Sequence, residues 1–127
     1  MRWLLLVEDH ALFREGLALL LKWRTGLGSV QSASIAETRL ILSNANENPV
    51  CAIVDLDLRD EDGIELLERL RGLPVVALVS DRSLERCVLA LEAGADEVLH
   101  KGEPSEMIIN AVEQLVGGSR TRNGSSS

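Results

Sequence analysis

Residues 50–55 read VCAIVD, an apolar run that ends in an aspartate. A short, uninterrupted apolar run is typical of a strand that is buried on both faces of a parallel sheet. Two other such runs also end in charged residues: LLLV at 4–7 precedes Glu8 and Asp9, and VLH at 98–100 precedes Lys101. Because ligands of open parallel sheets lie at the carboxyl ends of the strands, we expect these charged side chains to share one crevice.

Strand-like and helix-like segments alternate about five times along the chain. The predicted strands are 4–7, about 30–34, 50–55, 75–79 and 97–100, and the predicted helices are 11–23, 36–45, 64–71, 84–93 and about 104–116. Such alternation predicts an α/β fold: a doubly wound, five-stranded parallel sheet in the order 2-1-3-4-5, a flavodoxin-like three-layer sandwich. The switch point of that order lies between the first and third strands, which carry Glu8, Asp9 and Asp55.

The length of 127 residues fits one domain with its own core. We assign residues 1–116 to this domain. Residues 117–127 are small and polar, and predict a flexible tail or the stub of a linker.

The net charge of -7 argues against nonspecific binding of nucleic acid or of an anionic membrane surface. No apolar stretch approaches the roughly 18 residues of a membrane span, and the start of the chain does not resemble a signal peptide. Cys51 and Cys87 are interpreted as small apolar residues rather than as a disulfide framework. These features favour a cytoplasmic protein.

The acids at the strand ends repel one another unless a cation or a proton neutralises them. They therefore predict a small acidic metal site with Asp55 beside it. Other interpretations remain open for each residue: Glu8 and Asp9 could cap the first helix, and Asp55 could be a solvated loop acid. Likewise, Lys101 could be a surface lysine and Ser80 a turn residue. His10 and His100 are interpreted as structural or solvent-facing.

Four segments, in this order, carry a family resemblance: Val7–His10, Asp55–Gly63, Val79-Ser80 and Ala93–Lys101. With them, residues 3–116 resemble the receiver domain of bacterial two-component response regulators. The opening EDHALFREGL at 8–17 is most similar to the branch with a LuxR-type helix-turn-helix output domain.

The resemblance implies a phosphorelay signalling switch in which Asp55 accepts a phosphoryl group from a sensor histidine kinase. Lys101 would pair with a phosphoryl oxygen, and Ser80 would donate its hydroxyl to another. The chain would be a phosphoprotein with self-catalysed phosphoryl transfer and autodephosphorylation, rather than a conventional turnover enzyme.

The resemblance also implies a Mg²⁺ ion held by Glu8, Asp9, Asp55 and the backbone carbonyl of Asp57. Magnesium prefers oxygen ligands and keeps several waters, so a partial protein cage suffices.

Family behaviour places the signalling surface at Ser83–Val116, where Leu84, Val88 and Leu91 could supply apolar contacts. It implies a possible homodimer on phosphorylation and regulation of transcription. DNA would be contacted only through an output domain outside this sequence, and no membrane is involved.

Two positions depart from the family pattern, which usually has proline at Arg59 and an aromatic residue at Val98. A valine cannot make the inward swing of that aromatic ring. A second hypothesis is therefore a pseudo-receiver, an interaction module with impaired phosphorylation coupling. A third is a phosphatase of the haloacid-dehalogenase type, prompted by the Asp-x-Asp pattern of Asp55 and Asp57.

Overall fold

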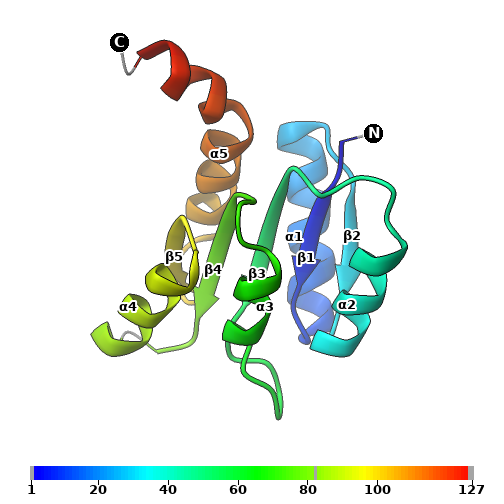
Figure 1. Ribbon diagram of the computed structural model, residues 1–127, viewed down its shortest axis with the longest axis vertical. Helices are drawn as coiled ribbons and strands as arrows, with labels where there is room; N and C mark the ends of the chain where they lie inside the picture. Colours follow the sequence, from blue (N-terminus) through cyan, green and yellow to red (C-terminus); the bar gives the residue numbers. More distant parts are fainter. Residues whose placement is uncertain (1, 82, 126–127) are drawn as a thin grey trace.

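The computed structural model describes residues 2–81 and 83–125, with side chains described as far as Gly117 (Figure 1). Five parallel strands form one sheet in the order β2-β1-β3-β4-β5. They are β1 (Leu4–Val7), β2 (Ser29–Ser32), β3 (Cys51–Asp55), β4 (Val75–Val79) and β5 (Glu97–His100). The predicted fold class and strand order are confirmed.

Helices cover both faces of the sheet (Figure 1). They are α1 (Ala11–Thr25), α2 (Ile35–Asn44), α3 (Ile64–Arg69), α4 (Leu84–Ala93) and α5 (Ser105–Ser125). The side chains of α1 and α5 pack on one face, and those of α2, α3 and α4 pack on the other. Within residues 2–81 and 83–125, no helix has the length and apolar character needed to cross a bilayer.

The three central strands are buried along their whole length, which explains their uninterrupted apolar sequences. Successive side chains point to opposite faces, so Leu5 lies in the core under α2, α3 and α4 and Leu6 in the core under α1 and α5. Each fully buried leucine contributes about 1.5–3 kcal/mol of transfer free energy. Burial also raises the pKa of the Cys51 thiol in β3 to about 12, as expected for an inert buried cysteine.

The boundary between β2 and α2 differs from the predicted strand at 30–34. β2 ends at Ser32, whose hydroxyl lies 2.7 Å from that of Thr38. Ser34 is instead the N-cap of α2, and its side chain accepts a hydrogen bond from the Glu37 N–H. A serine oxygen satisfies a free N–H at a helix start, so the capping bond ends the strand early.

The last helix runs past its predicted end near Val116. We expected an irregular tail from Gly117, but α5 continues to Ser125 beyond the edge of the sheet (Figure 1). Glycine weakens a helix by about 1 kcal/mol without breaking its hydrogen bonds, and no proline follows in the chain. Residues 126–127 lie outside the described residues. A linker role for 117–127 stays a prediction.

Gly63 closes the loop between β3 and α3 against the backbone of Asp55 and Leu56. A Cβ atom at this position would lie 2.6 Å from the Asp55 carbonyl oxygen and 2.8 Å from the Leu56 Cα. The Gly63 N–H also donates to the Leu56 carbonyl oxygen at 2.9 Å. Only glycine allows this approach, which fixes the loop directly behind Asp55.

Replacing Gly63 by alanine is therefore expected to lower the free energy of unfolding by about 2–3 kcal/mol, because the contacted atoms belong to the backbone. The matched control is Gly16→Ala on the exposed side of α1, where a Cβ meets nothing within 4 Å. It should raise stability by about 0.5–1 kcal/mol. Urea unfolding of both variants measures the difference, and equal stabilities would contradict the close contact.

Candidate functional site

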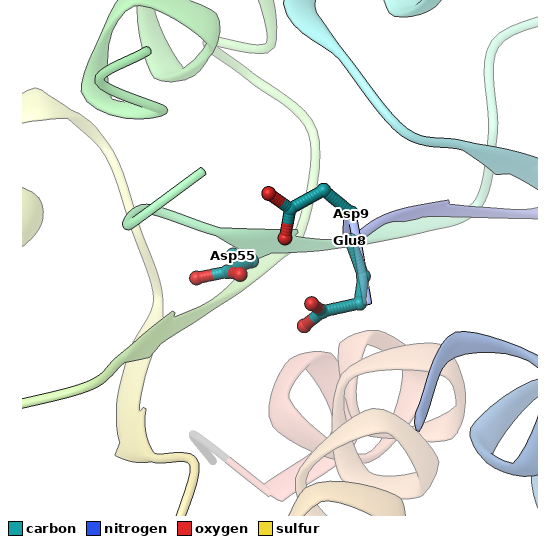
Figure 2. Close-up of side chains that lie close together, drawn as sticks. All are labelled: Glu8, Asp9 and Asp55. Carbon is teal, nitrogen blue, oxygen red and sulfur yellow. The ribbon is translucent and has the colours of Figure 1, made fainter. Parts of the chain in front are cut away.

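The predicted site residues gather at the carboxyl ends of the strands. Glu8 and Asp9 follow β1, Asp55 is the last residue of β3, and Lys101 follows β5. The register pairs Val7 with Val54, so β1 and β3 end side by side. Figure 2 shows the three carboxylates close together at the ends of β1 and β3. The crevice predicted from the sequence is therefore present.

One carboxylate oxygen from each of Glu8, Asp9 and Asp55 lies within 4.8 Å of the others. Glu8 and Asp55 are fully buried, whereas Asp9 is half-buried. Burial raises the pKa of Glu8 above its ordinary value, against the opposing effect of hydrogen bonds from Lys101 and the His10 N–H. Two buried acids at this distance require a compensating cation.

Lys101 supplies one such cation. Its Nζ atom lies 2.9 Å from Glu8 Oε1 and donates to Glu8 Oε2 at 3.0 Å and to Asp55 Oδ2 at 3.1 Å. The ammonium also lies 5.2 Å from the centre of the Phe13 ring. Burial alone would lower the pKa of Lys101, but the bonds with the two acids raise it above its ordinary value. The lysine is therefore held in its charged form.

The donor set fits a hard divalent cation. All three side chains offer carboxylate oxygens, which suit Mg²⁺ or Ca²⁺ rather than a softer metal. Glu8 Oε1 is buried and, among the described residues, accepts no hydrogen bond, although Lys101 Nζ is close by. Its approach to the ammonium lacks hydrogen-bonding geometry, so this oxygen keeps a lone pair for another ligand. The three carboxylates also carry more negative charge than the single Lys101 ammonium can balance.

The segment after Asp55 is fixed by side-chain hydrogen bonds. Asp55 Oδ1 accepts from the Asp57 N–H at 2.9 Å, and Asp57 Oδ2 accepts from the Ser80 N–H at 2.7 Å. Asp57 Oδ1 accepts from the Arg86 guanidinium at 3.0 Å. The Asp57 carboxylate thus links three elements and does not lie with the acidic cluster. Sequence reasoning missed Arg86, because a side chain that crosses from another helix leaves no local motif.

Arg59 changes the loop in a way that the sequence did not indicate. Its N–H donates to Asp9 Oδ2 at 2.7 Å. Proline, the usual residue of the family here, has no N–H and could not make this bond. The hydrogen bond ties the loop after β3 to the Asp9 carboxylate and orients it.

His10 and His100 both have structural roles, as expected. His10 is the N-cap of α1, and its Nδ1 accepts from the Phe13 N–H. His100 Nδ1 accepts from the Gly102 N–H at 2.9 Å, so its Nε2 carries the proton and donates to the Ser80 carbonyl oxygen at 2.8 Å. The His100 ring thereby connects the ends of β4 and β5 beside Ser80 and Lys101.

Comparison with known proteins identifies the family. The profile described as response regulator receiver domain matches residues 4–113. The chain belongs to this family. It is 32% identical over 120 residues to the nitrate/nitrite response regulator protein NarL of Escherichia coli K12, covering 91% of this chain and 55% of that protein. It is 34% identical over 118 residues to the transcriptional regulatory protein PhoP of the same strain, covering 88% of this chain and 51% of PhoP.

The chain therefore spans about half the length of these curated relatives. Among solved structures, it is similar to a CheY-like receiver domain protein from Methanospirillum hungatei, with a TM-score of 0.83 and 25% identity over 96% of this chain and 98% of that one. A LuxR-family response regulator from Aurantimonas matches with a TM-score of 0.78 and 26% identity, covering 91% and 84%. The predicted family is confirmed, and the LuxR-type branch is among its relatives.

A third structure, a response regulator protein from Burkholderia pseudomallei, matches with a TM-score of 0.78 and 26% identity, covering 97% of this chain and 73% of that one. That protein was solved with a phosphorylated aspartic acid, a calcium ion and citrate.

The hydrogen bonds of the His100 ring to the Ser80 carbonyl and the Gly102 N–H can be tested by a substitution at Gly102. An alanine Cβ there would lie 2.8 Å from His100 Cε1 and 2.9 Å from Nδ1. Gly102→Ala should displace the ring, break its bond to the Ser80 carbonyl and lower the free energy of unfolding by about 1–2 kcal/mol.

His100→Leu supplies the second background for this test, because it removes the imidazole. In a double-mutant cycle by urea unfolding, the alanine at 102 should cost clearly less stability when leucine replaces His100. The same cost in both backgrounds would show that the ring contact is unimportant.

Proposed function

We propose that Asp55 of this receiver domain accepts a phosphoryl group from a sensor histidine kinase in the cytoplasm. One observation carries the proposal: the buried Asp55 carboxylate lies 3.1 Å from Lys101 Nζ and beside two further acids, at the carboxyl end of β3. A buried carboxylate next to a charged lysine is both a nucleophile and half of a phosphate-binding pair.

The proposed transfer follows from this geometry. An Asp55 carboxylate oxygen forms a bond to phosphorus while the phosphorus–nitrogen bond of the donor phosphohistidine breaks, and its electron pair leaves with the imidazole. The Lys101 ammonium remains within reach of the new phosphoryl oxygens and balances their charge. Ser80, at the end of β4, donates its hydroxyl to another phosphoryl oxygen.

We infer that Glu8, Asp9, Asp55 and the Asp57 backbone carbonyl hold a Mg²⁺ ion. When bound, the ion neutralises the acids and the transferring phosphoryl group. The buried Glu8 Oε1, with its unused lone pair, supports this assignment. Arg59 orients Asp9 through its N–H, so the loop presents a fixed oxygen to the metal.

The alternatives fit the geometry less well. A pseudo-receiver needs no complete site, yet Glu8, Asp9 and Asp55 lie together and Lys101 pairs with two of them. A haloacid-dehalogenase-type phosphatase needs its second aspartate as an acid near the nucleophile. The Asp57 carboxylate is instead taken by the Ser80 N–H and Arg86.

We further propose that the chain acts within a longer regulator of transcription, because its curated relatives are about twice as long and bear regulatory names. The signalling surface would be Ser83–Val116, with homodimerisation as one outcome of phosphorylation. On α4, Leu84, Val88 and Leu91 are all exposed, so none of them is needed for the core. The net charge of -7 leaves DNA contact to another domain.

Acetyl phosphate with Mg²⁺ should add one phosphoryl group to the wild type, detected by intact-protein mass spectrometry. Asp55→Asn should abolish the addition, because an amide is not a nucleophile of this kind. The matched control is Asp60→Asn in the same loop, where φ is 62° and asparagine is tolerated. Phosphorylation of Asp55→Asn, or its loss in the control, would overturn the assignment.

Magnesium binding is tested separately by thermal unfolding. Mg²⁺ should raise the Tm of the wild type, since a ligand that binds only the folded state stabilises it. Glu8→Gln and Asp9→Asn should each weaken the apparent affinity about tenfold or more. Glu97→Gln, an exposed acid at the start of β5, serves as the control and should respond as the wild type does. An unchanged affinity in both site variants would exclude this metal site.

A further inference from the structure

Arg86, in the first turn of α4, reaches across to the loop behind Asp55. Its Nη2 atom donates to the Leu56 carbonyl oxygen at 2.9 Å, to Asp57 Oδ1 at 3.0 Å and to Asp62 Oδ1 at 3.0 Å. Its Nη1 atom donates to Asp62 Oδ2 at 3.3 Å. One guanidinium group therefore bridges both ends of the loop from β3 to α3 and joins them to α4.

This contact differs from an ordinary surface ion pair. The Arg86 side chain is only 22% exposed, and Leu56, whose carbonyl oxygen it contacts, is fully buried. The fork of the guanidinium fits the Asp62 carboxylate, which raises the pKa of Arg86 and lowers that of Asp62. A lysine, with one compact charge, could not reproduce this geometry.

Asp57 connects the guanidinium to the phosphoacceptor. Its N–H donates to Asp55 Oδ1, its Oδ2 accepts from the Ser80 N–H, and its Oδ1 accepts from Arg86. A continuous chain of hydrogen bonds thus runs from the Asp55 carboxylate to α4. Phosphorylation converts the Asp55 carboxylate into an acyl phosphate, a mixed anhydride in which the carboxylate charge is lost, and a movement of Ser80 toward the phosphoryl group would pull on its bond to Asp57.

We propose that Arg86 is a positioning residue that couples phosphorylation of Asp55 to α4 through Asp57. The proposal rests on the proposed function, because it gives that site a route to the signalling surface. Without a phosphoryl group, the guanidinium holds the first turn of α4 against the β3–α3 loop. When Asp55 is phosphorylated, the shift of Ser80 and Asp57 weakens the contact of Arg86 with the loop and loosens α4. Val98 in β5 cannot transmit the change by an aromatic swing, and Arg86 acts without it.

The test compares Arg86→Gln with Arg71→Gln. Arg71 also spans α3 and α4, through Glu68 and the Glu92 carbonyl oxygen, but at the far end of α4. Amide hydrogen exchange of α4 is measured on the full chain with Mg²⁺, with and without beryllium fluoride as the phosphoryl mimic. Circular dichroism verifies folding. Arg86→Lys serves as the conservative variant and replaces Arg86→Gln if that variant does not fold.

Beryllium fluoride should accelerate exchange at the start of α4 at least about fivefold in the wild type and in Arg71→Gln. In Arg86→Gln, exchange should already be fast without the mimic and change less than about twofold, with Arg86→Lys in between. Acetyl phosphate should still phosphorylate Asp55 in this variant, which a merely misfolded site would not allow.

A wild-type response in Arg86→Gln and Arg86→Lys would overturn the coupling role. So would a wild type that binds the mimic with no change in α4. If the wild type binds no beryllium fluoride at all, the proposed function itself fails, and this result is distinct from the other two.

Discussion

The ion pairs of Lys101 with Glu8 and Asp55 are the constraint on which the rest of the site depends. They join residues 93 and 46 positions apart in sequence, across the ends of three strands. Two fully buried carboxylates would strongly oppose folding without such a cation. The sheet order that brings the ends of β1 and β3 together places these two acids side by side, and the lysine after β5 balances their charge.

Around these ion pairs, polar contacts hold the backbone of the neighbouring loops in place. The Arg59 N–H orients Asp9, the His100 ring ties Ser80 to the turn after Lys101, and Asp57 gathers the Ser80 N–H and Arg86. Each contact joins the end of one strand to the next. Asp57 also connects Asp55 to α4, because its N–H donates to Asp55 Oδ1 and its carboxylate accepts from Arg86.

The sequence predicted most of the fold because the central strands are buried on both faces and read as plain apolar runs. The strand-end charges predicted which side chains meet, since a parallel sheet brings its carboxyl ends together. Arg86 could not be foreseen, because its contacts with the β3–α3 loop depend on where α4 lies. The sequence did not predict where β2 ends or where α5 ends. A serine can lie in a strand or cap the next helix, and a pair of glycines can end a helix or lie within it.

The loop behind Asp55 also bears on how this protein can vary. Gly63 lies against the backbone of Asp55 and Leu56, and its N–H donates back to the Leu56 carbonyl. A loop closed on the backbone of Asp55 and Leu56 has a fixed number of residues, because one insertion or deletion would move the Asp55 carboxylate. Its side chains are freer, as an arginine in place of proline demonstrates. Such a segment tolerates substitution but not a change of length.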